Sequence, residues 1–557
     1  MTVSTDKKRI FLIGFSGTGK SSAGRVIANI LGWEFKDVDE LISLRLGKSI
    51  EKIFSEDGES VFRDQEVLVI NELSNETNSI VISTGAGAVT SESTLELLKS
   101  TGFVINLEAS PELIYQRLSN IHEVNGAEAM VRPLLSSSDP INRIRGLKSE
   151  RQFLYMSAHW TIHTDQMSTG QVANEAVRAW RKNGNYFNLT GSPNVVSVVN
   201  AESGSYPVVV GWNILEEQLG SHVHGLGIKG RAHIICDSNV VHPYGRSAQR
   251  SLHNAGIEMT LFTFPAGEAS KNLKTVETIY EWLASKRVER GDVVIAVGGG
   301  VVGDVAGYVA STILRGIKLI HVPTSLTAMV DSSIGGKTGV DLPVGKNLIG
   351  AFHQPIMVLA DVAALKTLPQ RVLKEGWAEA IKHGFAFDET LVEIYENELE
   401  MLLGLDPEVT TSVISKNIKI KSDIVTNDER EVYGLRQLLN YGHTIGHGVE
   451  AAAGYDRYLH GEAVSIGMIG AAKLGEILSV TPIEVVNRLI ELITRFDLPV
   501  NYTDVSIDDI QAAMSRDKKM LSGEISWVLL DAVGHAMTYK GVDQAIVLQV
   551  LKELSKT

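Results

Sequence analysis

Residues 9–31 read RIFLIGFSGTGKSSAGRVIANIL, and this stretch decides the fold of the first part of the chain. Residues 9–13 form a short apolar run, as a buried strand does, and residues 21–31 have the apolar spacing of a helix. Between them, Gly14 to Ser21 fit GxxxxGK[ST], the phosphate-binding loop that follows a strand and opens a helix. Its glycines let backbone amides surround phosphate oxygens, and the helix N-terminus adds partial positive charge. The stretch therefore predicts a nucleotide site in an α/β domain.

The loop itself supplies the candidate nucleotide ligands. Lys20 can reach the β- and γ-phosphates of a nucleotide, and the Ser21 hydroxyl can bind Mg²⁺. The predicted ATP-binding residues of the loop are Gly14, Ser16, Gly17, Thr18, Gly19, Lys20 and Ser21. The alternative is a glycine-rich turn that binds nothing.

The rest of the chain divides into regions of different pattern. Apolar runs at 80–83 and 103–106 alternate with helical segments, which predicts a parallel sheet in residues 1–182. The Asn-, Gly- and Ser-rich segment 183–194 is interpreted as a linker. Residues 195–368 repeat the αβ pattern, with strands expected at 232–236, 293–297 and 319–322. Residues 369–557 form long amphipathic helices with few strand signals, so we expect a mainly helical third region.

Composition limits the class of protein. The chain has 557 residues, 44% hydrophobic and 21% charged, which fits a globular protein of two or more domains. Its net charge of −14 argues against a nucleic-acid or anionic-membrane binder. The single cysteine, Cys236, cannot form an intramolecular disulfide, and the polar start of the chain does not read as a signal peptide. No apolar run reaches the ~18–20 residues of a membrane span, so we expect a cytoplasmic protein with small-molecule ligands and no membrane or nucleic-acid partner.

Further motifs follow the phosphate loop in a fixed order. Asp37 and Asp39 lie in WEFKDVDE, Arg63 lies in GESVFRDQE, and STGAGAV forms a second glycine-rich turn. As isolated residues, such acids and arginines are most often surface charges. Together with GFSGTGKS, VRPLL and SERQFLY, however, they make residues 7–180 resemble shikimate kinase.

The resemblance implies ATP- and Mg²⁺-dependent phosphorylation of shikimate. It implies that Asp39 orients the attacking hydroxyl, that Asp37 acts near Mg²⁺, and that Arg132 in the lid reaches the transferring phosphoryl group. It also implies that Arg63 and Arg151 clamp the shikimate carboxylate and that Arg117 lies over adenine. The backbone at Gly85 and Gly87 would lie close to the shikimate ring. The chain departs from the family at Ala86, where a third consecutive glycine is usual, and in a long lid at 119–131.

The second region contains candidate cofactor and anion sites. VGGGVVGD at 297–304 joins a predicted strand to a helix. It does not match GxGxxG, but its glycines would let a pyrophosphate approach the backbone amides. The alternative is a tight turn that binds nothing. PAGEASK adds Glu268 and Lys271. Residues 314–352 combine glycines with several charged side chains, which predicts a pocket for an anionic ligand rather than a basic surface loop.

A metal site is predicted from histidine spacing. Arg436, Asn440, His443 and His447 are spaced to lie on one face of a single helix, and His460 and Glu379 lie in HGEAVSIGM and GWAEAIKHG. Three nitrogen or oxygen ligands with an open position are typical of a catalytic divalent metal. Spacing alone assigns both His443 and His447 to the metal.

Residues 195–550 resemble 3-dehydroquinate synthase. The matching blocks include PAGEASK, GGGVVGDVAGYVAST, HVPTSLTAMVDSSIGGKTGV, GKNLIGAFHQP, GWAEAIKHG and GLRQLLNYGHTIGHGVE. The resemblance places the metal, zinc or cobalt, on Glu379, His443 and His460, and leaves His447 near the substrate. It implies that NAD is bound by Asp237, Glu268, Lys271, Gly299, Gly300, Asp304, Thr324, Ser325, Lys346, Thr367 and Leu368. It implies that the substrate is held by Arg315, Asp331, Lys337, Asn347, Lys382, Lys421, Arg436, Asn440 and His447, with Lys337, Lys382, Asn440 and His447 catalytic.

The implied reaction converts 3-deoxy-D-arabino-heptulosonate 7-phosphate to 3-dehydroquinate with loss of phosphate, using NAD catalytically. We therefore expect a bifunctional fusion of two non-consecutive steps on the route to chorismate: a P-loop kinase domain with a parallel sheet, an αβ NAD-binding part and a helical metal-binding part. A homodimer through the synthase part is also expected. Two alternatives stay open: a metal-dependent polyol dehydrogenase that releases NADH, and a kinase-like domain that only senses nucleotide.

Overall fold

The computed structural model describes residues 9–76, 78–125, 139–156, 158–165, 167–183, 194–201, 203–343, 345–432, 434–454, 457–520 and 525–556. The chain forms two compact units, Met1–Ser192 and Pro193–Thr557. The boundary falls within the predicted linker, most of which lies outside the described residues. Within those ranges, no helix is both long enough and apolar enough to cross a membrane.

The first unit is built on a five-stranded parallel sheet in the order β2-β3-β1-β4-β5. Its strands are β1 (Arg9–Ile13), β2 (Glu34–Asp37), β3 (Ile80–Ser83), β4 (Phe103–Glu108) and β5 (Trp160–His163). Its helices are α1 (Lys20–Leu31), α2 (Val38–Leu46), α3 (Ile50–Lys52), α4 (Glu59–Asn75), α5 (Glu92–Thr101), α6 (Pro111–Asn125), α7 (Pro140–Met156) and α8 (Thr169–Asn183), with short turns η1 (Ile53–Asp57) and η2 (Ala88–Thr90).

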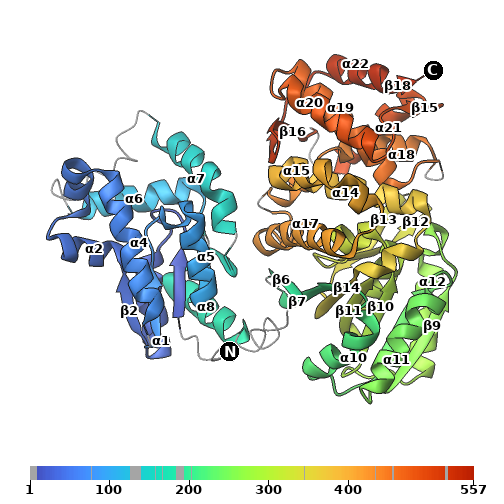
Figure 1. Cartoon of the computed structure of the whole chain (residues 1–557), viewed down its shortest axis with the longest axis horizontal. Helices are drawn as coiled ribbons and strands as arrows, with labels where there is room; N and C mark the ends of the chain where they lie inside the picture. The colour runs from blue at the N-terminus through green and yellow to red at the C-terminus, as the bar shows by residue number, and fades with distance from the viewer. Residues whose placement is uncertain are drawn as a thin grey trace. The chain divides into compact units, whose positions relative to one another are not determined.

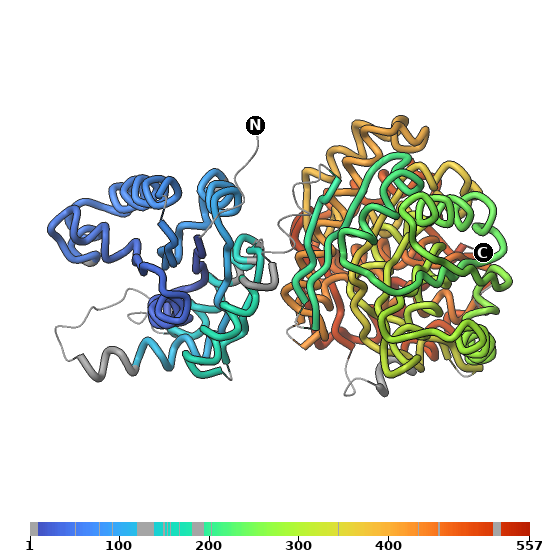
Figure 2. Tube along the Cα trace, turned by 90° about the horizontal axis from the view of Figure 1, so that it is seen from below, coloured from blue at the N-terminus to red at the C-terminus, as the bar shows by residue number. Residues whose placement is uncertain are grey.

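Side-chain alternation along β1 explains why helices cover both faces of this sheet (Figure 2). Ile10 and Leu12 point into one apolar core, which α1 and α8 complete. Phe11 and Ile13 point into the other core, which α4 to α7 help to form. Every residue of β3 and β4 is buried, as expected for strands in the middle of a parallel sheet.

The second unit begins with a seven-stranded sheet in the order β6-β7-β14-β11-β10-β8-β9, parallel except for the antiparallel pair β6-β7. Its strands are β6 (Val195–Ala201), β7 (Gly204–Gly211), β8 (Ala232–Asp237), β9 (Met259–Phe264), β10 (Val293–Gly298), β11 (Lys318–Pro323) and β14 (Met357–Asp361). The accompanying helices are α10 (Leu215–Gly225), α11 (Arg246–Asn254), α12 (Leu273–Ser285) and α13 (Gly300–Thr312), with turns η3 (Val241–Gly245), η4 (Glu268–Ser270), η5 (Ile313–Arg315), η6 (Ala328–Ser332) and η7 (Val362–Thr367). A separate hairpin joins β12 (Lys337–Leu342) to β13 (Gly345–Phe352).

Helices make up most of the chain after residue 369, at the orange and red end of the second unit in Figure 1. They are α14 (Gln370–Phe387), α15 (Glu389–Asn397), α16 (Leu399–Leu403), α17 (Pro407–Asn427), η8 (Arg436–Asn440), α18 (His443–Ala452), α19 (His460–Ile477), α20 (Ile483–Arg495), α21 (Ile507–Met520) and α22 (Gln544–Leu554). Two short strand pairs accompany them: β15 (Tyr502–Thr503) with β18 (Ser555–Lys556), and β16 (Trp527–Ala532) with β17 (His535–Tyr539). The predicted α/β class with a helical C-terminal part is confirmed.

One local prediction is wrong. Arg436, Asn440, His443 and His447 do not share one helix, because η8 ends at Asn440 and α18 begins at His443. Gly442 lies between them with φ 82°, a left-handed conformation that breaks the helix. A side chain there would also lie 2.6 Å from Met468 Cγ, so glycine lets α18 and α19 approach closely.

Candidate active sites

The phosphate loop lines a cavity of about 580 Å³ in the first unit. Gly14 has φ 135°, and a Cβ there would lie 2.4 Å from the carbonyl oxygen of Leu107, so the turn requires glycine. The Lys20 ammonium donates to the carbonyl oxygens of Gly14 at 2.8 Å and Phe15 at 3.0 Å. These bonds hold the Lys20 side chain across the loop, where a phosphate would lie.

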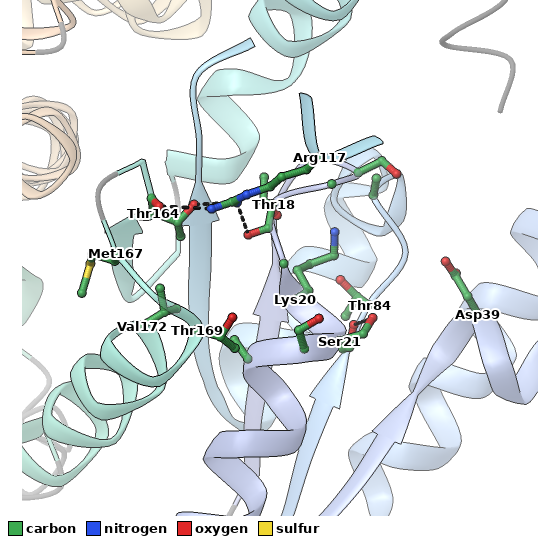
Figure 3. Close-up of a pocket in the computed structure, with 17 residues that line it drawn as sticks. Thr18, Lys20, Ser21, Asp39, Thr84, Arg117, Thr164, Met167, Thr169 and Val172 are labelled. Carbon is green, nitrogen blue, oxygen red and sulfur yellow. Dashed lines mark hydrogen bonds between the residues drawn. The ribbon is translucent and has the colours of Figure 1, made fainter. Parts of the chain in front are cut away.

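Arg117 closes one side of this cavity. Figure 3 shows its side chain crossing above Lys20, with bonds from Nη1 to the Thr18 carbonyl at 3.2 Å and the Thr164 hydroxyl at 3.0 Å. Because these bonds hold the guanidinium plane at the cavity wall, it is available to lie against a flat ring, the position predicted for adenine.

The donor set for Mg²⁺ lies at the ends of two elements. The Ser21 hydroxyl, in the first turn of α1, donates to Asp37 Oδ2 at 2.6 Å. Asp37 ends β2, and its other carboxylate oxygen accepts the backbone N–H of Asp39 at 3.1 Å. A hydroxyl and a carboxylate beside a phosphate loop are the oxygen ligands that Mg²⁺ prefers, so these residues fit the ion.

The second glycine-rich turn lies against the predicted shikimate-binding side chains. A Cβ on Gly87 would lie 2.1 Å from Arg63 Nη1, and one on Gly85 would lie 3.1 Å from Asp39 Oδ1. Residues 24 or more positions apart in sequence are therefore brought together around one turn. Asp39 also lines the phosphate cavity (Figure 3), so it adjoins both the phosphate loop and this second turn.

Sequence reasoning missed Glu66 in this cluster. It is 2% exposed, and its Oε2 accepts from Arg63 Nη1 at 2.8 Å. Burial raises the pKa of Glu66, although the Arg63 bond opposes the rise. Its Oε1 accepts no hydrogen bond from the described residues and lies 2.1 Å from a Cβ built on Gly85. The signal that could have found it is its i+3 spacing from Arg63 on a helix.

Helix α7 brings two further groups to the turn. The Tyr155 hydroxyl donates to the Ala86 carbonyl at 2.6 Å, and burial raises the pKa of Tyr155 to about 12. Arg151 interacts with Tyr155 from the preceding helical turn, which places its guanidinium near Ala86. Ala86 itself lines the cavity. Arg132, the predicted lid arginine, lies outside the described residues.

In the second unit, the predicted NAD ligands gather at the carboxyl edge of the sheet. Asp237 ends β8, Gly299 and Gly300 follow β10, and Thr324 and Ser325 follow β11. The Thr324 N–H donates to the Gly298 carbonyl at 3.0 Å, which joins the ends of neighbouring strands. Gly299 caps α13, so the helix N-terminus points toward the place where a pyrophosphate would bind. The Thr367 hydroxyl, before Leu368, bonds with the Tyr244 hydroxyl at 2.7 Å.

A buried lysine links this edge to the β12–β13 hairpin. Lys271 Nζ lies 2.7 Å from Asp304 Oδ2 on α13 and donates to Asn347 Oδ1 at 2.6 Å. Glu268 is 4.0 Å from the same ammonium and 3.8 Å from Lys346 Nζ. Burial raises the pKa of Asp304, against the opposing effect of Lys271.

A second cavity, of about 600 Å³, is lined by many of the predicted substrate ligands. They are Asp331, Lys337, Asn347, Lys421 and Arg436, and the predicted NAD ligand Asp304 lines the cavity as well. They come from α13, η6, β12, β13, α17 and η8, so the fold concentrates cations from distant segments. Such a cavity suits an anionic ligand, as the sequence predicts.

The cations of this cavity are paired with acids. Lys421 Nζ lies 2.5 Å from Asp331 Oδ1, and Lys337 bonds with Glu431. Burial lowers the pKa of Lys421 to about 8, although Asp331 opposes the fall. Arg436 Nη1 donates to the Glu429 carbonyl at 2.6 Å, which fixes its direction.

Arg315 is not brought to this cavity. It is exposed at the end of η5, with φ 68°, and is not among the residues that line the cavity. Its predicted role in substrate binding therefore gains no support within one copy of the described chain.

Glu379, His443 and His460 converge on one point. Glu379 Oε1 lies 3.3 Å from Nε2 of His443 and 3.3 Å from Nε2 of His460. Ligands about 2.0–2.2 Å from a tetrahedral metal lie about 3.3–3.6 Å apart, so these distances fit a divalent metal. Glu379 is fully buried, and its Oε1 accepts no hydrogen bond from the described residues. The orphaned oxygen and the two nitrogens fit zinc or cobalt in this place.

The charges around the point also favour a cation. Burial opposes charge on His460, but the neighbouring carboxylates of Glu379 and Glu450 raise its pKa to about 10. Burial would raise the pKa of Glu379, yet Lys382 and His443 hold it well below its usual range. Lys382 is buried and paired with Glu379. Positive charge between the carboxylates is therefore stabilised.

His447 lies beside the group. One nitrogen of each of His443, His447 and His460 lies within 4.8 Å of the others. His447 and Asn440 are exposed, unlike Glu379, so both can meet a substrate. Glu450 and Glu375, which sequence reasoning missed, support His460: Glu450 Oε2 lies 3.2 Å from its Nδ1, and Glu375 Oε2 accepts the next N–H, of Gly461, at 2.8 Å.

Known proteins match both units. The family model for shikimate kinase matches residues 16–181, and those for the N-terminal and C-terminal parts of 3-dehydroquinate synthase match 261–375 and 376–520. A 3-dehydroquinate synthase of Symbiobacterium thermophilum is 46% identical over 329 residues, which are 58% of this chain and 90% of that protein.

Two solved structures resemble the second unit. A 2-epi-5-epi-valiolone synthase from Streptomyces hygroscopicus subsp. jinggangensis 5008, with NAD⁺ and Zn²⁺ bound, is 28% identical with a TM-score of 0.59. A 2-deoxy-scyllo-inosose synthase complexed with carbaglucose-6-phosphate, NAD⁺ and Co²⁺ is 28% identical with a TM-score of 0.58. Each match covers 64% of this chain and 99% of the other.

Proposed function

The chain belongs to the 3-dehydroquinate synthase family and carries a shikimate kinase domain before it, and from this premise we propose how its residues perform the two reactions. The first unit phosphorylates shikimate with ATP. The second converts 3-deoxy-D-arabino-heptulosonate 7-phosphate to 3-dehydroquinate and phosphate. Both serve the route to chorismate.

In the kinase, Lys20 and the loop amides hold the β- and γ-phosphates, and Ser21 and Asp37 hold Mg²⁺. Arg63, anchored by Glu66, binds the shikimate carboxylate with a planar fork of donors. Asp39 orients the attacking hydroxyl from its place beside the phosphate loop and the second glycine-rich turn. Catalysis then rests on positioning and on neutralisation of phosphate charge.

In the synthase, Glu379, His443 and His460 hold the metal, and the carboxyl edge of the seven-stranded sheet holds NAD. When bound, the metal supplies a Lewis acid at a substrate hydroxyl and NAD a reversible hydride acceptor. Lys337, Lys421 and Arg436 bind the phosphate and carboxylate and stabilise the departing phosphate.

The remaining synthase groups hold or move protons. Lys382 lies beside Glu379, and its ammonium donates hydrogen bonds to oxygen atoms of the substrate. His447 and Asn440, which are exposed beside the metal ligands, exchange protons with the substrate hydroxyls. This role for His447 is consistent with a metal that is bound by Glu379, His443 and His460 and not by His447.

One observation carries the synthase proposal: an orphaned Glu379 oxygen lies 3.3 Å from two histidine nitrogens in the unit that contains a cation-lined cavity. The cavity's lysines and arginine favour a phosphorylated acid over a neutral polyol. The greater identity to a 3-dehydroquinate synthase than to the cyclases of solved structure favours this substrate.

The test is to assay the purified full chain with each substrate set. We expect ADP formation that depends on shikimate, and phosphate release from the heptulosonate phosphate without net NADH. Net NADH from a polyol would favour a dehydrogenase instead. ATP binding without shikimate-dependent turnover would favour a nucleotide sensor. We also propose that the synthase unit forms a homodimer, which sedimentation of the full chain measures.

A further inference from the structure

Glu450 is a buried carboxylate that no step above uses. It lies on α18, one helical turn after His447, and is 6% exposed. Each of its two oxygens has a separate partner: Oε2 lies 3.2 Å from His460 Nδ1, and Oε1 accepts from Lys346 Nζ at 2.7 Å. A buried carboxylate with two such partners is placed to hold both of them.

The bond to His460 fixes which ring nitrogen can bind a metal. An ionised carboxylate only accepts hydrogen bonds, so His460 Nδ1 carries the proton. Lys346 Nζ at 2.7 Å and His460 Nδ1 at 3.2 Å give the two oxygens of Glu450 the donor partners of an ionised carboxylate. Nε2, which faces Glu379 Oε1 at 3.3 Å, is then the ring nitrogen left to bind a metal. A carboxylate behind a ligating histidine commonly orients the ring in this way.

The bond to Lys346 leads to the other half of the unit. Lys346 lies on β13, and its Nζ is also 3.8 Å from Glu268 Oε1, at the predicted NAD site. The next residue, Asn347, accepts from Lys271 at 2.6 Å. The hairpin therefore reaches α18 on one side and the η4 segment on the other.

We propose that Glu450 is a positioning residue that fixes the orientation of His460 and, through Lys346, couples metal binding to NAD binding. The inference rests on the proposed metal ligands Glu379, His443 and His460. It assigns Glu450 no contact with substrate. The alternative is that Glu450 and Lys346 form a purely structural ion pair, in which case substitution of Glu450 would leave the ligand field of the metal unchanged.

The experiment titrates the metal-free full chain with Co²⁺, with and without saturating NAD⁺, and records the visible absorption of bound cobalt. In the wild type, NAD⁺ should tighten Co²⁺ binding by about 5- to 150-fold, the usual range for coupled sites. Glu450→Gln should weaken Co²⁺ binding by about 10- to 100-fold and change the cobalt spectrum. Lys346→Met changes a predicted NAD ligand; it should bind Co²⁺ alone within a few-fold of wild type, but lose most of the effect of NAD⁺ at NAD⁺ concentrations shown by titration to saturate the variant.

The matched control is Glu476→Gln, which neutralises an exposed carboxylate on α19, the helix that carries His460. It should leave affinity, spectrum and coupling unchanged. If Glu450→Gln does not fold, as judged by circular dichroism, Glu450→Asp replaces it. This variant keeps the negative charge on a side chain that is one carbon shorter, so its Co²⁺ affinity should lie below that of the wild type and its cobalt spectrum should be shifted.

Three results would overturn the inference. Wild-type Co²⁺ affinity and spectrum in both Glu450 variants would remove the positioning role, and equal affinity with and without NAD⁺ in the wild type would remove the coupling. If His443→Ala binds Co²⁺ as tightly as the wild type, the proposed metal site is wrong as well. Failure of the metal site is therefore distinguishable from failure of the role of Glu450.

Discussion

Gly87→Ala tests the carboxylate clamp of the kinase from the glycine side. The added Cβ would lie 2.1 Å from Arg63 Nη1, 2.3 Å from Cζ and 2.4 Å from Nη2. Gly87 has φ −99°, which any residue adopts, so the substitution adds no backbone strain. What must move is the far end of the Arg63 side chain.

The size of the effect follows from that displacement. Heavy atoms in contact lie about 3.5–4.0 Å apart, so the guanidinium must shift by more than about 1 Å. A charge-assisted hydrogen bond contributes about 1.5–3 kcal/mol, and its loss raises the KM for shikimate by about 10- to 150-fold. The KM for ATP should stay within about two-fold, because the phosphate loop is a separate turn.

Steady-state kinetics on both kinase substrates measure this effect, with Gly146→Ala as the control. Gly146 lies on α7, and a Cβ there meets nothing within 4 Å, so the Gly146→Ala chain should have the wild-type KM for shikimate. A folded Gly87→Ala chain with wild-type KM for shikimate would refute the placement of Arg63 against the substrate. A rise in both KM values would show a general disturbance of the unit instead.

Three further predictions test the remaining assignments. Lys20→Ala should lower shikimate phosphorylation by at least about 100-fold while phosphate release by the synthase continues; equal loss of both activities in a folded chain would contradict independent units. His443→Ala should lose bound metal, whereas His447→Ala should keep it and lose about 10²- to 10⁴-fold in synthase rate. Metal analysis of both variants measures this, and loss of the metal from His447→Ala would show that His447 is a metal ligand, as histidine spacing alone predicts. Since burial lowers the pKa of Lys421 to about 8, its ammonium is lost as pH rises through that value, and the KM for the heptulosonate phosphate should rise between about pH 7 and 9. Lys421→Arg, which stays charged, should flatten that rise, and a wild-type KM constant to pH 9 would exclude Lys421 from phosphate binding.

The sequence predicts best where a motif is also a local structure. The phosphate loop is contiguous, and the bonds of Lys20 reach back only to Gly14 and Phe15. The strand at 9–13 is recovered with the same limits, because a buried parallel strand is a continuous apolar run. The fold class follows from such runs.

The candidate sites depend on packing that spacing does not contain. Histidine spacing suggested one helix, but Gly442 breaks it because α19 packs too closely for a side chain. Glu450 looks like one more acid on a helix until the fold brings His460 and Lys346 to its two oxygens. Arg315 has the charge expected of a phosphate ligand, yet η5 leaves it exposed and away from the cavity.

The two compact units, each with its own apolar cores, have a consequence for gene expression. One message yields one kinase site and one synthase site, so transcription and translation cannot change the ratio between them. A cell that needs more of one step than of the other must obtain the difference from turnover numbers, inhibition or a second gene. Selection on either activity therefore acts on the dosage of both.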